Sequence, residues 1–437
     1  MTWHSLGSVE SASAAPKYQR RVVDDELDEL LAGLPAISID GPKGVGKTAT
    51  ALQRSATSYR LDDPATLEIV LANTKSLVRG EEPILIDEWQ RWQPSWDLVR
   101  RAVDERSSPG RFLLTGSASP HAPETHSGAG RIVTVRMRPM TLVEREVERP
   151  TVSLGRLLEG AAEIEGETQV GLHDYTDEIV TGGFPGIRSP SPRVQRSQLA
   201  GYVARIVDRD FDEAGQGVRN PQSLRRWMTA YAAATGTTTT MEKIRDAATA
   251  GDGPPPARTT VQTYRDVLER IWIADPLPGY VPTMSRLNRL TTSPKWYLAD
   301  PALAVTLLDG TSAKLLAGGE GDVAIPRDGT LLGALFESLA ALELRVFAQA
   351  AEAEVAHLRT KTGDREVDFL VEGHDGQAVA FEVKLAELPS AHDVRHLIWL
   401  KERLGERLAD MVVLTTGSHA YRRPDGVAVV PLALLGP

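Results

Sequence analysis

Apolar and polar positions in the first third of the chain follow the pattern of an α/β fold. An apolar run at residues 35–40 leads into a glycine-rich turn and an alanine-rich helical stretch, and further apolar runs occupy residues 83–88, 111–117 and 132–135. Short, continuous apolar runs between helical stretches are typical of strands that are buried on both faces. We therefore expect a parallel sheet whose carboxyl ends meet at one edge.

The middle of the chain has a mostly helical pattern. Helical periodicity extends from about residue 150 to 235, and residues 257–271 place their apolar side chains on one helical face. A shorter helix is expected at residues 241–248, and the runs at 272–273 and 296–298 are expected to pair as a β-wing. This arrangement looks like a winged helix-turn-helix, whose second helix commonly enters a DNA groove.

Residues 366–384 alternate apolar and polar positions around a glycine-flanked turn, which predicts a β-hairpin. If the loop centres on Asp375, then Asp368 lies directly across from Glu382, where like charges weaken the pairing. Side chains alternate between the two faces of a strand, so Lys384 shares this face. A divalent cation between the carboxylates would turn the repulsion into a binding site.

Composition narrows the classes of protein that fit. A chain of 437 residues exceeds what one core supports, so roughly two to four domains are expected. The absence of cysteine excludes disulfides, thiolate metal sites and thiol nucleophiles. No stretch approaches the ~20 uncharged apolar residues of a membrane span, and the N-terminus lacks a secretory pattern. We expect a cytoplasmic protein without membrane contact and with a disordered leader at residues 1–18.

Charge is distributed unevenly along the chain. The formal net charge of −10 argues against attraction of nucleic acid to the whole surface. Between Arg188 and Lys295, however, 16 Lys and Arg stand against 10 Asp and Glu, a net charge of +6. A polyanion such as DNA is therefore expected to meet the middle of the chain.

The sequence GPKGVGKT matches the phosphate-binding pattern G-x-x-x-x-G-K-[ST] in full, between a predicted strand and a predicted helix. Backbone N–H groups of such a loop converge on phosphate oxygens at the helix N-terminus. Lys47 is expected to reach the β- and γ-phosphates, and Thr48 to bind Mg²⁺. The residues expected to bind ATP here are Gly41, Pro42, Lys43, Gly44, Val45, Gly46, Lys47 and Thr48.

Two later strands end in polar residues that suit the same site. The run at residues 83–88 ends in Asp87 and Glu88. Asp87 is expected to hold Mg²⁺ through water, and Glu88 to orient or polarise the attacking water. Thr115 or Ser117, at the end of the next run, is expected to sense the γ-phosphate. The alternative is a set of capped or solvated strand ends.

Together these segments resemble an AAA-type ATPase domain. In that family, an arginine just before the next strand often reaches the nucleotide of a neighbouring subunit. Arg131 precedes the run at residues 132–135, so the resemblance implies Arg131 as an arginine finger, with Arg138 as a rival. Such a finger stabilises transition-state charge. A finger that acts between subunits implies a homo-oligomer.

The C-terminal pattern resembles the core of a PD-(D/E)XK nuclease. Its parts are a helix acid, a strand acid and a Glu-x-Lys on the next strand, here Glu337 within the largely apolar stretch 332–344, Asp368, Glu382 and Lys384. The resemblance implies Mg²⁺ on Asp368 and Glu382, aided by Glu337. Lys384 would position or activate the metal-bound water that attacks a phosphodiester. The alternative is a fold that keeps these residues as an ion-pair network without turnover.

Candidates for DNA contact lie on the second helix of the central pair. Arg258, Gln262 and Arg265 lie off its apolar stripe. Winged helices also serve as protein-docking modules, and the proline-rich spacer AGDGPPPARTTV is longer than the usual turn. Docking of a partner protein therefore stays open as the alternative.

From about residue 20 to its end, the chain is similar to a widespread family of bacterial and archaeal ATP-binding proteins. Members join an AAA-type ATPase to a nuclease-like domain formerly of unknown function. The domains expected from the resemblance are a disordered leader at 1–18, an AAA-type ATPase at 19–150, a helical linker or lid at 151–225, a winged helix-turn-helix at 226–305 and a restriction-endonuclease-like α/β domain at 306–437.

Two functional hypotheses follow. The first is a Mg²⁺-dependent ATPase, binding ATP and ADP, that contacts DNA through its central domain and cleaves it at the C-terminal site. The second is a nucleotide-switched interaction protein whose nuclease-like domain is catalytically silent. The two share the ATP site and differ at Lys384.

Overall fold

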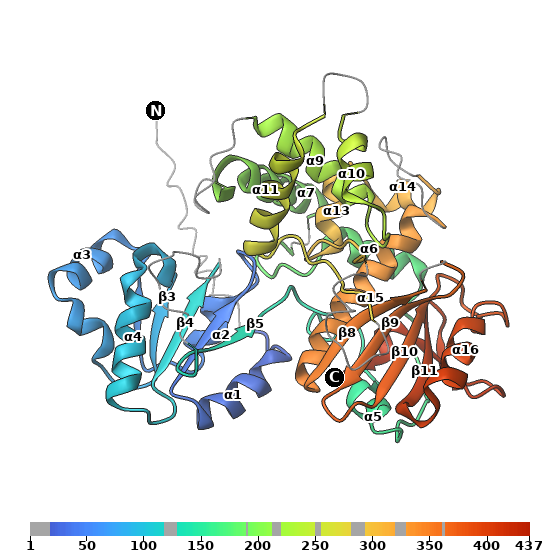
Figure 1. Ribbon diagram of the computed structural model, residues 1–437, viewed down its shortest axis with the longest axis horizontal. Helices are drawn as coiled ribbons and strands as arrows, with labels where there is room; N and C mark the ends of the chain where they lie inside the picture. The colour runs from blue at the N-terminus through green and yellow to red at the C-terminus, as the bar shows by residue number, and fades with distance from the viewer. Residues whose placement is uncertain are drawn as a thin grey trace, which may run out of the picture.

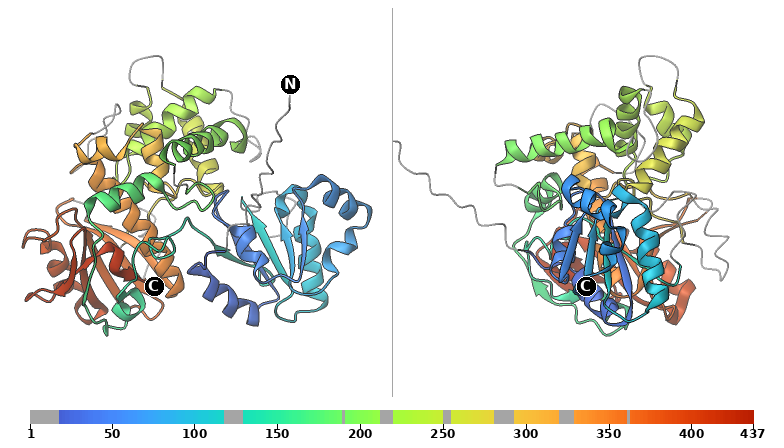
Figure 2. Two further views of the ribbon diagram at one scale, coloured as in Figure 1. Left: turned by 180° about the vertical axis from the view of Figure 1, so that it is seen from behind. Right: turned by 90° about the vertical axis from the view of Figure 1, so that its left-hand side faces the viewer.

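The computed structural model has three bodies, two α/β domains and a helical region (Figure 1). Figure 2 shows the two sheets standing apart, with the helical region lying mainly over the C-terminal domain. No helix among the described residues is long and apolar enough to cross a membrane. All but the last residue of the predicted leader lies outside the described part of the chain. The structure describes residues 18–117, 129–188, 191–211, 220–249, 255–280, 293–319, 329–360 and 363–437.

The N-terminal domain is built on a five-stranded parallel sheet. Its strands are β1 (Ala36–Asp40), β2 (Thr57–Arg60), β3 (Ile84–Asp87), β4 (Phe112–Gly116) and β5 (Val133–Arg136). They lie in the order β2-β3-β4-β1-β5. β1, β3 and β4 are buried at every residue, as continuous apolar runs predict for central strands.

Helices cover both faces of this sheet (Figure 1). They are α1 (Val23–Gly33), α2 (Lys47–Leu52), α3 (Pro64–Ala72), α4 (Pro94–Glu105) and the 3₁₀ turns η1 (Thr74–Val78) and η2 (Trp89–Trp92). α4 begins with a proline, which costs no hydrogen bond in a first helical turn. Trp96 on α4 packs against Trp89, with ring centroids 4.8 Å apart, and both are buried in the core on that side of the sheet.

The helical region packs around buried aromatic side chains. Its elements are α6 (Leu172–Thr181), α7 (Pro192–Arg205), the π-helix η3 (Ile206–Asp210), α9 (Pro221–Ala233), α10 (Met241–Ala247), α11 (Arg258–Arg270), α13 (Pro301–Leu307) and α14 (Ser312–Leu316). α10 and α11 agree with the two central helices that the periodicity predicts. Trp227 on α9 lies 5.3 Å from Tyr231 and 6.0 Å from Tyr264, measured between ring centroids.

The expected β-wing is reduced to isolated bridges in the described residues. Ala274 pairs with Leu298, and Leu277 pairs with Lys295, but neither pair belongs to a longer strand. Side chains at the start of the second run point to two bodies: Trp296 packs against Tyr231 of the helical region, while the preceding residue, Lys295, contacts the C-terminal domain. The winged helix therefore stays a prediction.

The C-terminal domain is a seven-stranded mixed sheet in the order β7-β12-β13-β11-β10-β9-β8. One long apolar helix, α15, packs against β8, β9 and β10. Its strands and helices are β7 (Gly166–Glu167), β8 (Ala353–Arg359), β9 (Glu366–Gly373), β10 (Ala378–Val383), β11 (Leu408–Thr415), β12 (His419–Arg422), β13 (Ala428–Pro431), α5 (Leu154–Leu158), α15 (Leu331–Ala350), α16 (Arg395–Leu404), η4 (Gly405–Arg407) and η5 (Leu432–Leu434).

Part of the expected linker at residues 151–225 belongs to this C-terminal domain. β6 (Val152–Ser153) pairs with β14 (Leu435–Gly436), and β7 extends the large sheet by pairing with β12. The segment expected as a linker or lid thus contributes strands to the C-terminal domain. Strands of two residues have no apolar periodicity, so the sequence carries no signal for them.

Candidate nucleotide site and acidic cluster

The loop between β1 and α2 has the backbone that a phosphate-binding sequence requires. Gly44 and Gly46 have φ angles of 80° and 105°, in the left-handed region that glycine enters at little cost. An added Cβ at Gly41 would lie 2.1 Å from the Met137 carbonyl oxygen, so the backbones meet too closely for any side chain. The loop ends at the N-terminus of α2, where phosphate groups commonly bind.

Lys47 begins α2 and is buried beneath the loop. Its Nζ donates to the carbonyl oxygens of Gly41 at 2.8 Å and Pro42 at 2.9 Å. Burial lowers the pKa of Lys47 to about 8, while nearby carboxylates, Glu88 first among them, oppose the shift. The ammonium is therefore poorly solvated and held by carbonyl oxygens at the base of the loop.

Thr48, Asp87 and Thr115 meet at the carboxyl edge of the sheet. Thr48 Oγ1 donates to Asp87 Oδ1 at 2.7 Å, and Thr115 Oγ1 donates to the same oxygen. Asp87 ends β3, and Thr115 lies in β4, its parallel neighbour, so the sheet delivers both to one edge. Hydroxyl and carboxylate oxygens are ligands that Mg²⁺ takes at nucleotide sites.

Glu88 lies beside this trio with its carboxylate held by an amide. Its φ of 54° turns the chain sharply after β3, and its N–H donates to Thr115 Oγ1 at 3.2 Å. Gln90 Nε2 donates to the Glu88 carboxylate and also to Ser117 Oγ at 3.0 Å. Burial raises the pKa of Glu88, and the Lys47 ammonium opposes that shift. Sequence reasoning missed Gln90, for which the only signal is its place two residues after the acid pair.

The two candidate arginine fingers lie in different surroundings. Arg131 is exposed, and its Nε donates to Asp104 Oδ1 at 2.8 Å, so a role toward a neighbouring subunit stays a prediction. Arg138 turns inward, with Nε 3.4 Å from Asp275 Oδ2 and Nη1 3.3 Å from Gln349 Oε1. Burial lowers the pKa of Arg138 to about 9. Arg138 is thus engaged within its own chain.

The candidate DNA-reading residues lie on α11. Arg258 is exposed at the first residue of the helix. Gln262 Nε2 donates to Asp266 Oδ1 at 2.7 Å, and Arg265 Nε donates to Glu269 Oε1 at 2.6 Å. Two of the three candidates therefore have an acidic partner one helical turn further on. Glu269 offsets the charge of Arg265, and Asp266 occupies the amide of Gln262.

β9 and β10 pair in the register that the sequence predicts. The pairing ends with Phe381 opposite Phe369, one residue before Glu382 and Asp368, and Val383 N–H donates to Asp368 Oδ2 at 3.0 Å. Both carboxyl groups are buried, at 5% and 9% exposure of the residues. Lys384 Nζ donates to Glu382 Oε2 at 2.8 Å. The predicted strand acids and the lysine are brought together on one side of the sheet.

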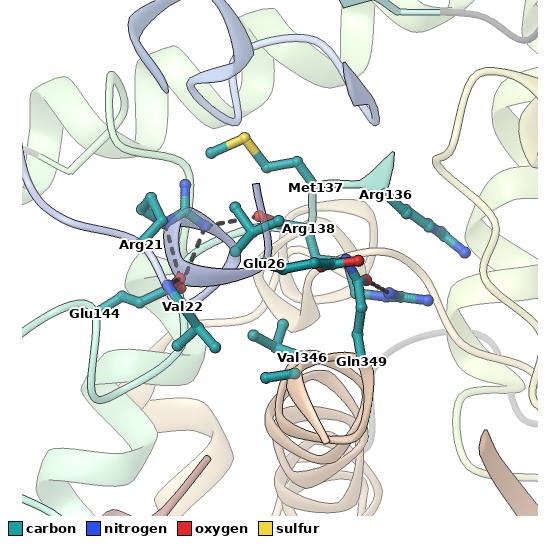
Figure 3. A pocket seen from close by; sticks show the side chains of 11 residues that line it. Arg21, Val22, Glu26, Arg136, Met137, Arg138, Glu144, Val346 and Gln349 are labelled. Atoms are coloured by element: carbon teal, nitrogen blue, oxygen red, sulfur yellow. Dashed lines mark hydrogen bonds and ion pairs between the residues drawn. The ribbon is translucent and has the colours of Figure 1, made fainter. Parts of the chain in front are cut away.

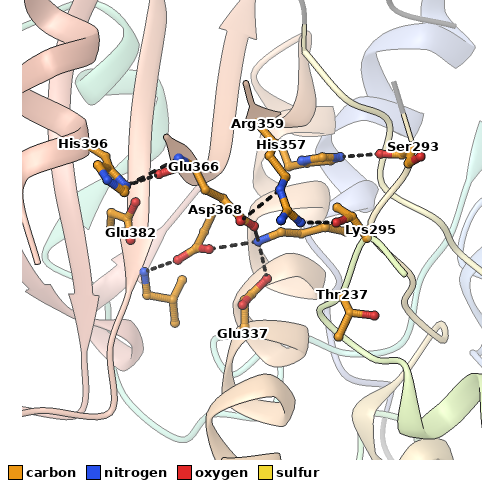
Figure 4. Close-up of polar contacts among 12 residues, drawn as sticks. Thr237, Ser293, Lys295, Glu337, His357, Arg359, Glu366, Asp368, Glu382 and His396 are labelled. Carbon is orange, nitrogen blue, oxygen red and sulfur yellow. Dashed lines mark hydrogen bonds and ion pairs between the residues drawn. The ribbon is translucent and has the colours of Figure 1, made fainter. Parts of the chain in front are cut away.

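A lysine from the central part of the chain enters this acidic cluster. Lys295 Nζ lies 2.9 Å from Asp368 Oδ1, 3.0 Å from Glu337 Oε1 and 3.0 Å from Glu366 Oε1 (Figure 4). Tyr297 Oη also donates to Glu337. The Lys295 side chain is only 1% exposed. The cation that the paired acids were expected to need is supplied here by the chain itself.

Electrostatics within the cluster favour this arrangement. Burial alone would raise the pKa of Asp368, but the Lys295 and Lys384 ammonium groups lower it to about 2. Burial and the Asp368 carboxylate raise the pKa of Glu382 to about 8, and burial raises that of Glu337 to about 7. Of these three acids, Asp368 is therefore the one that is most readily ionised, and Lys295 contacts it directly.

The predicted metal ligands Glu337, Asp368 and Glu382 lie in this cluster with an ammonium among them. Within the described residues, no group of three or more His, Cys, Asp or Glu side chains is placed to hold a metal ion. Sequence reasoning missed Lys295, because 73 positions separate it from Asp368 and no pattern links the two segments.

Three family models match successive parts of the chain. A model described as an AAA domain matches residues 34–146, and two domains of unknown function match residues 172–314 (DUF8612) and 332–435 (DUF4143). The first range contains the phosphate loop, the acid pair and the polar end of β4. Residues 34–146 are thus similar to an AAA domain. The AAA part of the expected architecture is supported, while ATP hydrolysis stays a proposal, and the other two descriptions name no activity.

Two similar proteins match nearly the whole chain, but their descriptions state no function. The uncharacterized proteins Mb2031c of Mycobacterium bovis and Rv2008c of Mycobacterium tuberculosis are each 25% identical over 437 residues, covering 98% of this chain and 87% of the relative. A solved structure of the Aeropyrum pernix ORC1 protein in complex with DNA matches at 14% identity, over 67% of this chain and 94% of that chain, with a TM-score of 0.25. That score is too low to show a common fold. The nuclease and winged-helix predictions receive no support from these comparisons.

Proposed function

We propose that this chain is a Mg²⁺-dependent ATPase that binds DNA through its helical region. The observation that carries the ATPase proposal is the meeting of Thr48, Asp87 and Thr115 beside Lys47 within an AAA-type domain. The DNA proposal is supported by the positive net charge of the central part of the chain, because electrostatic attraction of an anionic polymer is strongest there.

The residues at the sheet edge fit a nucleotide with Mg²⁺. Thr48 Oγ1 and Asp87 Oδ1 already share a hydrogen bond of 2.7 Å, so a hydroxyl and a carboxylate face one another where the metal would lie. Thr48 would hold Mg²⁺ directly and Asp87 through water. When bound, Mg²⁺ would offset the negative charge of the phosphates. Lys47 would bind phosphate oxygens, and Glu88 would orient the attacking water.

Two substitutions separate nucleotide binding from hydrolysis. Lys47→Ala should abolish binding of a fluorescent ADP analogue, because it removes the cation beneath the loop. Glu88→Gln should keep binding but lower kcat by at least ~100-fold, because an amide cannot take a proton from water. Lys75→Ala, an exposed lysine of the same domain, serves as the control for both assays. Wild-type turnover in Glu88→Gln would refute the assigned role.

DNA binding can be tested on α11 through its salt dependence. If Arg258 and Arg265 contact phosphates, each change to alanine should weaken binding and reduce the slope of log affinity against log salt by about 0.9. Arg101→Ala, an exposed arginine of α4, is the matched control. Affinity and slope that stay at wild-type values in Arg258→Ala and Arg265→Ala would exclude α11 as the contact surface.

A second candidate function has its own support in Lys295. In the first hypothesis, Glu337, Asp368 and Glu382 bind Mg²⁺ and Lys384 activates water for phosphodiester cleavage. In the second, the nuclease-like domain is silent and the protein is a nucleotide-switched interaction module. The ammonium of Lys295 favours the second, since it already pairs with Asp368 and Glu337, two of the three predicted metal ligands.

A cleavage assay decides between these two. Purified protein is incubated with DNA and Mg²⁺ or Mn²⁺, beside Asp368→Ala and Lys384→Ala. Cleavage that both substitutions remove would establish a nuclease, and no cleavage by any form would favour the silent domain. Cleavage that both variants retain would indicate a contaminant or another site.

Assembly through Arg131 belongs to the same proposal. If Arg131 acts on a neighbouring subunit, ATP turnover per subunit should rise with protein concentration, and Arg131→Ala should lose that rise. A monomer whose turnover is independent of concentration and unchanged by Arg131→Ala would defeat the homo-oligomer.

A further inference from the structure

The helical region packs directly on the phosphate loop. A methyl group built at Gly44 would lie 3.9 Å from the Phe184 ring and 4.0 Å from the Tyr202 ring, which is ordinary contact. Tyr202 Oη also donates to the carbonyl oxygen of Lys43 at 3.0 Å. A nucleotide on the phosphate loop would therefore lie close to side chains of the helical region.

A carboxylate from that second body holds a lysine of the loop. Lys43 Nζ lies 2.6 Å from Asp210 Oδ1, and the Asp210 side chain is 10% exposed. Asp210 is the last residue of η3, a π-helical turn, and such turns are rare and frequent at functional sites. A carboxylate beside a loop built for phosphate opposes the binding of a polyanion. A role in stabilising the phosphate loop does not by itself explain why position 210 carries an acidic residue.

The charge of Lys43 acts on the residues that handle nucleotide. Burial lowers the pKa of Lys47, and the Lys43 ammonium acts in the same direction. Burial raises the pKa of Glu88, and Lys43 is among the cations that oppose the shift. Lys43 is therefore within electrostatic range of the site, and Asp210 neutralises its charge.

We propose that Asp210 sets nucleotide affinity: its carboxylate pairs with Lys43, and the phosphates of ATP or ADP compete for Lys43 and displace the carboxylate. The inference rests on the proposed ATPase function. Displacement frees the end of η3, whose next residue, Phe211, packs edge-on against Tyr264 of α11 with ring centroids 6.0 Å apart. Nucleotide occupancy is thereby sensed at the helix proposed to meet DNA.

The test compares nucleotide affinity in near-isosteric variants. Asp210→Asn removes the competing charge and should bind a fluorescent ADP analogue about five- to tenfold more tightly than wild type. Asp208→Asn carries the same charge change on an exposed residue of η3 and should stay within about twofold of wild type. In a Lys43→Met background, Asp210→Asn should no longer tighten binding, because the pair is already broken.

The outcomes separate this inference from the function on which it rests. Wild-type binding that Lys47→Ala abolishes, together with an unchanged or weaker Asp210→Asn, overturns the inference and leaves the ATPase standing. Equal tightening by Asp208→Asn also overturns it, since the effect is then general. If wild type binds no analogue, or binds it equally without Lys47, the ATPase proposal fails and the inference with it.

A measurement on the unmodified protein covers the case in which Asp210→Asn does not fold. Adding saturating ADP and Mg²⁺ should speed hydrogen exchange of the η3 amides while slowing exchange in the phosphate loop. Protection of η3 that stays constant or increases on nucleotide binding would overturn the proposed displacement.

Discussion

Lys295 is a fully buried cation whose place in the fold depends on its partners. Taking an ammonium out of water costs several kcal/mol, which only close, well-placed carboxylates offset. Asp368, Glu337 and Glu366 all lie within 3.0 Å of its Nζ. The same contacts pin residues 293–298 of the central segment to the C-terminal domain. Removal of the ammonium would leave the buried Asp368 carboxylate with Lys384, at 4.0 Å, as its remaining cation.

Lys295→Met tests this dependence. The substitution keeps the length and apolar volume of the side chain but removes the charge, so the free energy of unfolding should fall by about 3–5 kcal/mol. Urea unfolding at pH 7 measures the change. Lys243→Met, at an exposed position of α10, should change it by less than about 0.5 kcal/mol. Equal stability of Lys295→Met and wild type would show that the cluster is solvated in solution.

Glu343 is a buried acid on α15. Its Oε1 accepts the Leu142 N–H at 2.8 Å, and among the described residues its Oε2 has no hydrogen-bond partner. Burial raises the pKa of Glu343 to about 8 from the usual 4.5. The folded state therefore binds a proton that the unfolded state has released between these two values.

The free energy of unfolding should consequently fall as pH rises from 4.5 to about 8. Glu343→Gln should remove this pH dependence. Below pH 4.5 the carboxyl group is neutral in both states and costs nothing. From pH 4.5 to about 8, wild type loses up to about 1.4 kcal/mol per pH unit relative to Glu343→Gln. Thermal unfolding of both proteins at pH 5, 6, 7 and 8 measures the difference. Parallel curves would mean that Glu343 is charged and solvated.

Secondary-structure elements were predictable where one physical signal dominates. The buried strands β1, β3 and β4 appear as continuous apolar runs, and the β9–β10 hairpin follows from period-two alternation around a glycine turn. The register follows as well, because the turn length alone sets Phe381 against Phe369. The phosphate loop is local, so its sequence specifies its shape.

Contacts between distant elements were not predictable from the sequence. Asp210 meets Lys43 across 167 positions, and Lys295 meets Asp368 across 73. Each contact depends on how two bodies pack, which no local propensity encodes. The paired strand acids did indicate a cation, but the pattern does not distinguish a divalent metal from an ammonium of the same chain.

The turn at residues 182–186 shows how an element depends on one close approach. Met140 N–H donates to the Gly183 carbonyl oxygen at 2.8 Å, and Gly183 N–H donates to Asp300 Oδ2 at 2.6 Å. A Cβ at Gly183 would lie 2.4 Å from the Met140 carbonyl oxygen. This distance is too short for a real contact, so the backbone would have to move. This turn also carries Phe184, which packs on the phosphate loop.

Gly183→Ala should therefore lower stability by about 1–3 kcal/mol and loosen the turn. Gly186→Ala, in the same turn, is the matched control, because an added Cβ there meets nothing within 4 Å. Denaturant unfolding of both variants measures the contrast. Similar stabilities would indicate that the turn and the residues after β5 separate freely in solution.

The three bodies of the molecule meet around one aspartate. Asp275 Oδ2 lies 3.0 Å from Arg136 Nη2, 3.4 Å from Arg138 Nε and 2.7 Å from Arg345 Nη1. Arg136 ends β5 of the N-terminal sheet, Arg138 follows two residues later, and Arg345 is on α15. A small pocket at this junction is lined by residues of both domains (Figure 3), where Arg138 reaches Gln349. One carboxylate thus joins the ATPase domain, the central segment and the C-terminal domain.

Asp275→Asn should uncouple these bodies. Burial would raise the pKa of Asp275, but the three guanidinium groups hold it well below its usual value of 3.8, so its stabilising effect is complete above that pH and is lost only in stronger acid. At pH 7 the substitution leaves three arginines facing one another and should cost about 3–5 kcal/mol. Because the substitution weakens the contacts between the bodies, calorimetry should show the N-terminal domain unfolding in a separate transition at lower temperature. The control is Asp246→Asn, at an exposed position of α10, which should keep the wild-type profile. A single unshifted transition in Asp275→Asn would show that apolar contacts alone join the bodies, and nucleotide signals would then have to cross through Phe184, Tyr202 and Asp210.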